Sequence, residues 1–390
     1  MATITAIKNV LTRKFRGASL DDVQGISNYT IFGEAASNLL SEIDPMETVR
    51  HAEINLFDNI NDYAAPTDLR GKKIIDIRPQ VDRSGIEFKH KLTEEFDQDK
   101  SVIDEWFSVE HDEGTKFLRI AKDVGYSIGV DTVAATTSWT ASGGAANVTT
   151  DTILFSEGGI SLRFDLGAAG GTMTYAPTST VVDLSDHESK SSFFRWIYFP
   201  DSSIVTSVTL RVGSDSSNYF SMTGVIHRGS IRTGWNLYRF DWNGATETGT
   251  ADTDNIDYEA LIFVTTAADT DIRIGKLFSK LPKPYEIVYY SNALFRPTTG
   301  STWLTQPTAD TDIMMLEHEA ENVFLYECAV LIAEDLQRDE DAQKFYTHLH
   351  GDGQKLGLYG QYKEDKPSES KKPSFTYYKP YRRTLTKVKP

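Results

Sequence analysis

The chain has 390 residues, of which 39% are hydrophobic and 25% are charged, and its formal net charge is −16. This length predicts two or three domains, and no stretch approaches the roughly 18 apolar residues of a membrane span. So acidic a chain is not expected to wrap nucleic acid, because neutralising phosphates requires lysine and arginine. The N-terminal residues lack the basic segment and apolar core of a signal peptide. The single cysteine, Cys328, excludes a disulfide within the chain and favours a buried thiol in a reducing cytosol.

Two helices are predicted near the N-terminus. Apolar residues recur at helical spacing over residues 3–16, and Gly17 ends that helix. Residues 18–30 have the composition of a loop. A second helix is predicted over about 31–43, where Asp44-Pro45 ends it.

A region of short strands follows these helices. Alternating apolar and polar residues predict strands rather than helices here. The residues His111-Asp-Glu-Gly114 have the composition of a hairpin turn between two of them. The predicted strands cover residues 48–56, 73–78, 86–91, 106–110 and 116–120.

Residues 132–281 have a composition of their own. They are rich in Ser, Thr, Gly and aromatic residues and contain only three lysines, Lys190, Lys276 and Lys280. Period-two runs bounded by turn residues predict an antiparallel two-sheet sandwich or jelly roll. The clearest runs lie at 161–166, 192–199, 205–212, 235–242, 260–264 and 271–274.

Helices return after this segment. Pro282-Lys-Pro284 indicates a domain boundary, and residues 285–290 are predicted to form one more strand. A polar loop over 296–312 precedes a long helix over about 313–336, which Asp310 or Asp312 is expected to cap. Cys328 lies on its apolar stripe. A shorter helix is predicted over 339–350.

Together these elements predict an α+β fold. The strand at 285–290 is expected to complete the sheet that begins near residue 48, so residues 1–131 and 282–350 form one discontinuous α+β domain. The jelly roll of residues 132–281 is inserted into it. Residues 351–390 lack any period and are predicted to form an extended, basic C-terminal arm.

The end of this arm is the candidate binding segment. Residues 361–390 carry nine Lys or Arg and three Asp or Glu, a net charge of +6 in an otherwise acidic chain. Such a segment suits nucleic acid or the acidic surface of another protein copy. The interleaved aromatic residues favour a protein partner. The candidate partner-binding residues are Tyr377, Tyr378, Tyr381, Arg382 and Arg383.

The sequence has little that indicates catalysis. Gly351-Asp-Gly353 follows a helix, whereas a phosphate-binding loop follows a strand. His348 and His350 are two residues apart, which places them on different sides of a helix and not in a metal-ligand pair. No Gly-x-Ser-x-Gly elbow is present. We therefore expect no cofactor, no metal and no enzymatic activity.

The segment Phe155-Ser-Glu-Gly-Gly-Ile-Ser-Leu-Arg-Phe164 and the segment Thr270-Asp-Ile-Arg-Ile-Gly275 resemble the opening and closing strands of carbohydrate-binding-module jelly rolls. In many such modules an early Glu and a late Asp help to hold a structural calcium ion, and Glu157 and Asp271 occupy comparable places. Two carboxylates are too few for a calcium ion, which takes six to eight oxygens. The candidate sugar-stacking platform comprises Trp139, Trp196, Trp235 and Trp242, of which Trp196 or Trp242 is expected in the core.

The flanking segments resemble another family. Three stretches, together with the helical part up to Tyr346, are similar to head-to-tail connector (adaptor or neck) proteins of tailed bacteriophages. The stretches are Asp44-Pro-Met-Glu-Thr-Val-Arg50, Tyr63-Ala-Ala-Pro-Thr-Asp-Leu-Arg-Gly-Lys-Lys-Ile-Ile-Asp-Ile-Arg78 and Glu286-Ile-Val-Tyr-Tyr-Ser-Asn-Ala-Leu-Phe295. The resemblance implies a homo-oligomeric ring, typically twelve-fold, between the portal and other neck or tail proteins. It also implies a virion protein that is assembled in the host cytoplasm and lets genomic DNA pass without sequence-specific binding.

Two other functions remain open from the sequence. A glycan- or receptor-binding protein that acts through the jelly roll is the main alternative. A glycan hydrolase comes third, because no pair of carboxylates stands out by its context.

Overall fold

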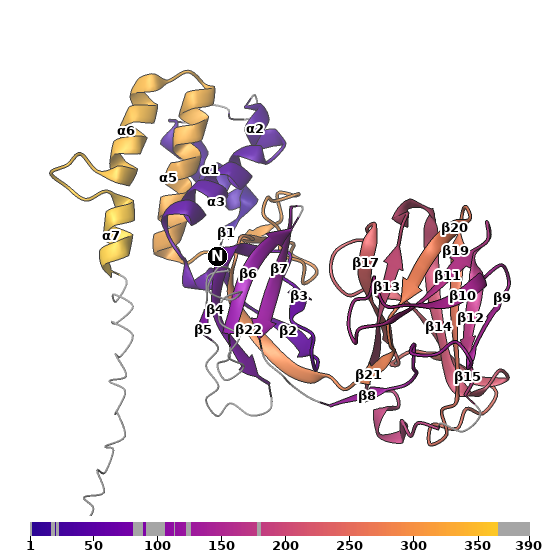
Figure 1. Ribbon diagram of the computed structural model, residues 1–390. Coiled ribbons are helices and arrows are strands. Elements are labelled where there is room, and N and C mark those ends of the chain that lie inside the picture. Colours follow the sequence, from indigo (N-terminus) through magenta and orange to yellow (C-terminus); the bar gives the residue numbers. More distant parts are fainter. Residues whose placement is uncertain are drawn as a thin grey trace, which may run out of the picture. The chain divides into compact units, whose positions relative to one another are not determined.

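The computed structural model describes residues 2–16, 20, 23–80, 89–90, 106–112, 114–121, 126–177 and 181–365. Its contacts divide the chain into two compact units (Figure 1). We call Met1–Arg50, Asp68–Lys73 and Tyr289–Pro390 the helical unit, and His51–Thr67 with Ile74–Val288 the β unit. The chain thus leaves the helical unit and returns to it, and the strands expected before residue 131 fall largely in the β unit.

The helical unit contains the helices that the periodicity predicts. The predicted helices at 3–16, 31–43 and 339–350 are confirmed as α1, α3 and α6, and the short helix α2 lies in the segment expected to be a loop. The helices are α1 (Ile4–Lys14), α2 (Gln24–Ser27), α3 (Thr30–Glu42), α5 (His318–Asp335), α6 (Asp339–His350) and α7 (Leu358–Asp365). A small sheet of order β1-β24-β23 joins β1 (Ala2–Thr3), β24 (Ile313–Met314) and β23 (Phe295–Arg296).

The predicted cap of the long helix is wrong. The helix α5 begins at residue 318, about one and a half turns later than expected. The carboxylate of Asp312 accepts hydrogen bonds from the main-chain N–H groups of Thr308 (2.7 Å) and Ala309 (3.0 Å) instead. It therefore closes the preceding turn. By contrast, Thr3 caps α1, because its hydroxyl oxygen accepts from Ala6 N at 3.2 Å.

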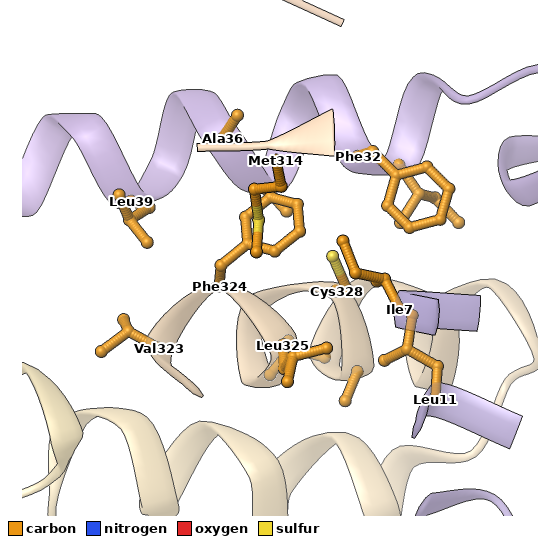
Figure 2. Close-up of a cluster of buried hydrophobic side chains, with 14 of the residues drawn as sticks. Ile7, Leu11, Phe32, Ala36, Leu39, Met314, Val323, Phe324, Leu325 and Cys328 are labelled. Atoms are coloured by element: carbon orange, nitrogen blue, oxygen red, sulfur yellow. The ribbon is translucent and has the colours of Figure 1, made fainter. Parts of the chain in front are cut away.

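The core of the helical unit combines the two ends of the chain (Figure 2). Leu11 of α1 and Leu39 of α3 pack in the same buried cluster as Phe324 of α5, and all three are fully buried. Cys328 is also fully buried, as expected, and burial raises its pKa. Because α5 contacts α1, α3, α6 and α7, it is apolar around most of its circumference.

The predicted arm is shorter than expected. Residues 358–365, placed in the arm from sequence, form α7, and its Tyr359 and Tyr362 belong to the core of the helical unit. Tyr359 also donates a hydrogen bond to Glu327 of α5 at 2.6 Å. The segment before α7 lacks a helical period in sequence because it is mostly glycine and polar residues. The two buried tyrosines of α7 decide the place of that helix. Residues 366–390 lie outside the described residues.

The strands that precede the sandwich belong to two sheets. As predicted, the strand after the sandwich joins the one that begins near residue 48, in the order β2-β22-β4. A second sheet has the order β3-β7-β6-β5, and β6 and β7 form the predicted hairpin, with Asp112 opposite Thr115. The strands are β2 (Val49–Leu56), β3 (Asp62–Ala64), β4 (Leu69–Pro79), β5 (Lys89–His90), β6 (Trp106–Asp112), β7 (Thr115–Ala121) and β22 (Lys283–Ser291). Most of the strand predicted at 86–91 lies outside the described residues.

A jelly-roll sandwich forms the rest of the β unit (Figure 1). Its first sheet, eight-stranded in the described residues, runs β10-β11-β20-β13-β17-β16, with β21 paired to β13 and β8 paired to β21. The strands are β8 (Ser127–Gly129), β10 (Ala146–Asp151), β11 (Ser161–Leu166), β13 (Ser192–Phe199), β16 (Val225–Ile226), β17 (Gly234–Asp241), β20 (Asp269–Ile274) and β21 (Phe278–Lys280).

The second sheet of the sandwich, six-stranded in the same described residues, runs β18-β15-β14-β19-β12-β9. Its strands are β9 (Trp139–Ser142), β12 (Gly171–Tyr175), β14 (Val205–Asp215), β15 (Asn218–Thr223), β18 (Thr246–Thr248) and β19 (Tyr258–Thr265). The pairs between the sandwich strands are antiparallel, as the alternation predicts. Among the helices of the described residues, none is long and apolar enough to cross a membrane.

A buried arginine joins the two sheets of the sandwich. The guanidinium group of Arg195 in β13 binds the carboxylates of Glu259 in β19 and of Asp131, and each side chain is at most 1% exposed. Asp131 also accepts a hydrogen bond from Leu277 N at 2.6 Å. Burial raises the pKa of both carboxyl groups, that of Glu259 to about 8. One guanidinium group balances one negative charge, so the two carboxyl groups share a proton at neutral pH.

We expect Glu259→Gln to flatten the pH dependence of stability. The folded pKa of Glu259 lies above its ordinary value of 4.5, so the folded protein keeps a proton that the unfolded chain has released. The contribution of Glu259 to stability therefore falls as the pH rises from 4.5 to about 8. Glutamine keeps a hydrogen-bonding oxygen for Arg195 and cannot ionise. Urea unfolding of both proteins across this range measures the slope.

Glu259→Ala is the matched comparison, because it removes the side chain that faces Arg195. We expect it to cost about 3 kcal/mol. Parallel stability curves for the wild type and Glu259→Gln would contradict the shared proton.

Candidate functional site

Two partly exposed tryptophans lie on neighbouring strands of the first sandwich sheet. In β13 the side chains alternate, so that Ile197 faces the core while Trp196 and Tyr198 face outward. In β17, Trp235 lies opposite Tyr198, and their rings meet edge to face at 5.5 Å. The outer surface of β13 and β17 therefore carries an aromatic strip of Trp196, Tyr198 and Trp235.

The structure divides the four predicted platform tryptophans into two pairs. Trp242 is 1% exposed and packs against Phe193 at 5.0 Å, and Trp139 is 6% exposed. Both belong to the sandwich core, so neither can stack on a ligand. Only Trp196 and Trp235 remain as the platform, and of the two tryptophans proposed for the core, Trp242 is the one that lies there.

A cavity of about 430 Å³ adjoins this strip. Its sandwich wall includes both tryptophans and the loop after β16, and its remaining wall comes from the strands that precede the sandwich. The lining residues on the sandwich side include Glu157, Phe194, Trp196, Arg228, Arg232, Trp235 and Lys280. Those from the preceding strands are Asn59, Ile60, Asn61, Asp62, Asp112 and Thr115.

The loop between β2 and β3 is fastened to the sandwich. Asp58 accepts hydrogen bonds from Lys280 Nζ at its carbonyl oxygen and from Ser127 Oγ at its carboxylate, both at 2.6 Å. The ring of Phe57 meets that of Phe194 in β13 at 4.8 Å. These contacts hold loop 57–62 beside the aromatic strip, within the same β unit.

A network of ion pairs reinforces this arrangement. Asp62 binds Arg119 at 2.9 Å and Arg228 at 2.6 Å, and Asp112 binds Arg228 at 2.5 Å and Arg232 at 3.1 Å. The guanidinium group of Arg228 also lies 3.5 Å from the centre of the Phe117 ring. Partly buried, charge-assisted bonds of this kind favour one orientation of the loop after β16.

His227 links the same parts as a neutral ring. Its Nε2 lies 2.9 Å from the carbonyl oxygen of Asp62, which can only accept, so Nε2 carries the proton. Its ring packs edge to face on Tyr63 and Phe194. Burial lowers the pKa of His227 to about 4, and the positive charge of Arg239 adds to this shift.

Glu157 and Asp271, which the resemblance places where many carbohydrate-binding modules hold calcium, do not come together. Asp271 pairs with Arg163 at 2.9 Å on the outer surface of β11 and β20, whereas Glu157 lines the cavity. Partial burial raises the pKa of Glu157, although Lys280 and Lys276 oppose the shift. Within the described residues, no group of three or more metal-ligating side chains could hold a metal ion.

The charged part of this site is not predicted by any pattern in the sequence. Asp62, Asp112 and Arg228 are far apart in the chain, and no motif connects them. The candidate partner-binding residues Tyr377, Tyr378, Tyr381, Arg382 and Arg383 lie outside the described residues.

Comparison with known proteins gives only distant likenesses. No protein-family model and no curated protein matches the chain. It is similar to a xylan-binding domain of carbohydrate-binding module family 22, with 16% identity and a TM-score of 0.27 over 41% of this chain and 96% of that one. A family 30 carbohydrate-binding module has 12% identity and a TM-score of 0.29 over 45% of this chain and 92% of that one.

A cleaved adhesin domain of Lys-gingipain from Porphyromonas gingivalis is also similar, with 12% identity and a TM-score of 0.24 over 40% of this chain and 98% of that one. TM-scores this low decide neither fold nor function. The jelly roll is established by its own strand order.

We expect the contribution of His227 to the stability of the β unit to decrease as the pH falls from 6.5 towards 4. In that range the unfolded chain binds a proton at His227 and the folded protein does not, so this contribution falls by at most about 3 kcal/mol. Between pH 4.5 and 6.5 it opposes the contribution of Glu259, whose folded pKa is raised. His227→Gln keeps a donor for the carbonyl of Asp62 and cannot titrate, so its stability should depend less on pH. Chemical unfolding at several pH values measures both; equal slopes would contradict the assignment.

Proposed function

We propose that this chain binds a carbohydrate in the cavity beside β13 and β17. The observation that carries the proposal is the pair Trp196 and Trp235, both partly exposed and both lining a cavity of about 430 Å³ with hydrogen-bonding side chains around them. A sugar ring has an apolar face of C–H groups and an edge of hydroxyl groups. An aromatic strip beside polar side chains complements both surfaces.

We propose binding without catalysis. Hydrolysis of a glycosidic bond commonly requires two carboxyl groups on either side of it. In the described cavity, Asp62 and Asp112 are each ion-paired with two arginines, which leaves Glu157 as a single carboxyl group. Asp62 and Asp112 therefore serve to hold the walls of the site.

We expect Trp235→Ala to weaken carbohydrate binding by at least about tenfold, because the stacking surface is lost from the centre of the site. Glycan-array binding of the full-length chain identifies ligands, and calorimetry with the strongest of them measures the loss. Trp196→Ala should have a similar effect.

Tyr219→Ala is the matched control. Tyr219 is a partly exposed aromatic residue on the outer surface of the other sandwich sheet, where it packs against Tyr258 at 6.3 Å. This change should leave binding unaltered. Loss of binding in Tyr219→Ala with full binding in Trp235→Ala would place the ligand on the second sandwich sheet and overturn the proposal.

As a second candidate, we propose that the helical unit forms a ring in the neck of a tailed phage. In this proposal, twelve copies connect the portal to tail proteins, and genomic DNA passes through the lumen without sequence-specific binding. The observation that favours it is the discontinuous helical unit, whose core joins segments from before and after the β unit (Figure 2). This is the layout on which the resemblance to connectors rests.

We expect deletion of residues 366–390 to weaken ring assembly and to leave the melting temperature of the monomer nearly unchanged. The deletion removes the basic segment with Tyr377 and Arg382 and keeps α7, whose tyrosines pack in the helical core. Native mass spectrometry and negative-stain imaging of the purified protein with its portal measure assembly. A full-length protein that stays monomeric and never joins a particle would count against the ring.

A further inference from the structure

We infer that the cavity binds the end of a short carbohydrate and not the interior of a long chain. The inference rests on the carbohydrate-binding function proposed above and concerns the walls of the same site. The specificity-determining residues are those outside the sandwich, in residues 59–62 and at Asp112 of β6 and Thr115 of β7.

The first support is the composition of the cavity wall. An aromatic strip on an open sheet would leave both directions along the strip free for a long chain. Here residues 59–62, together with Asp112 and Thr115, line the cavity beside the strip. The loop that leads into β3 and the facing ends of β6 and β7 thus close part of a surface that the sandwich alone would leave open.

The second support is that this wall is held firmly. Asn61 accepts a hydrogen bond from Ile120 N through its carbonyl oxygen (2.7 Å). Asp62 is bound through its carbonyl oxygen by His227 and through its carboxylate by Arg119 and Arg228. A segment fixed at so many points cannot move aside cheaply for a longer ligand.

The third support is size. A cavity of about 430 Å³ lies near the lower limit of the roughly 300–1,000 Å³ that small-molecule sites occupy. One or two sugar rings suit such a volume. Further rings would have to extend into solvent, where they add little binding energy.

Calorimetry with oligosaccharides of defined length tests this inference. The probes are cellobiose and cellohexaose, xylobiose and xylohexaose, and maltose and maltohexaose, each titrated into the full-length chain. We expect the disaccharide and the hexasaccharide of the bound sugar to have dissociation constants within about threefold of each other, with one protein molecule per hexasaccharide. A hexasaccharide that binds more than about tenfold tighter, or that carries two protein molecules, overturns the inference.

Two wall variants separate this inference from the function on which it rests. Asn61→Ala removes a lining side chain and should weaken binding of the disaccharide about fivefold. Arg119→Met should raise the affinity for the hexasaccharide relative to the disaccharide, because Arg119 does not line the cavity and its ion pair with Asp62 helps to hold the wall. Thermal unfolding confirms that both variants are folded.

The outcomes then differ. If Trp235→Ala abolishes binding but both wall variants keep the wild-type affinities and length preference, the carbohydrate site stands and the role of the wall is wrong. If the wild type binds no glycan on the array and none of the six probes, the proposed function fails and the inference fails with it.

Discussion

The sandwich depends on one buried guanidinium group. Arg195 lies between the sheets and binds Glu259 of the opposite sheet and Asp131 of the incoming chain. Because side chains alternate along a strand, an inward Arg195 requires Trp196 to face outward. A slip of one residue in β13 would turn Arg195 outward, leave its two carboxylate partners buried without it, and bury the tryptophan. The ion cluster in the core therefore fixes the position of the aromatic strip on the surface.

A second set of charges holds the cavity wall that lies beside that strip. Asp62 and Asp112 come from strands that precede the sandwich, and Arg228 and Arg232 come from the loop after β16. Acids and bases in a cavity are often taken as the reacting groups. Here they neutralise one another and hold two sheets at the cavity, so the tryptophans are the residues to which the proposal assigns ligand contact.

The sequence predicts the strands of this site well, but it does not predict which of their residues come together in the fold. Period-two alternation locates β13 and β17 and shows that Trp196 and Ile197 face opposite sides. Trp235 and Trp242 are seven positions apart, so the same alternation places them on opposite faces. It does not indicate which face the second sheet covers, and the packing of the two sheets buries Trp242.

Contacts that span long stretches of chain are equally hidden from a local pattern. Asp62 and Arg228 pair across 166 positions, and no spacing rule connects them. The same limit explains one error in the helical unit, because Tyr359 gains its place where Glu327 of α5 lies within reach. The error at Asp312 has a local cause, since its side chain suits a helix cap but closes the turn that precedes it.

The two candidate functions place their demands on different parts of the chain. The sandwich core, its ion cluster and the cavity use residues of the β unit alone. The core of the helical unit uses segments on either side of it, so it can form without any side chain of the cavity. The ring proposal and the carbohydrate proposal therefore rest on separate residues, and neither excludes the other.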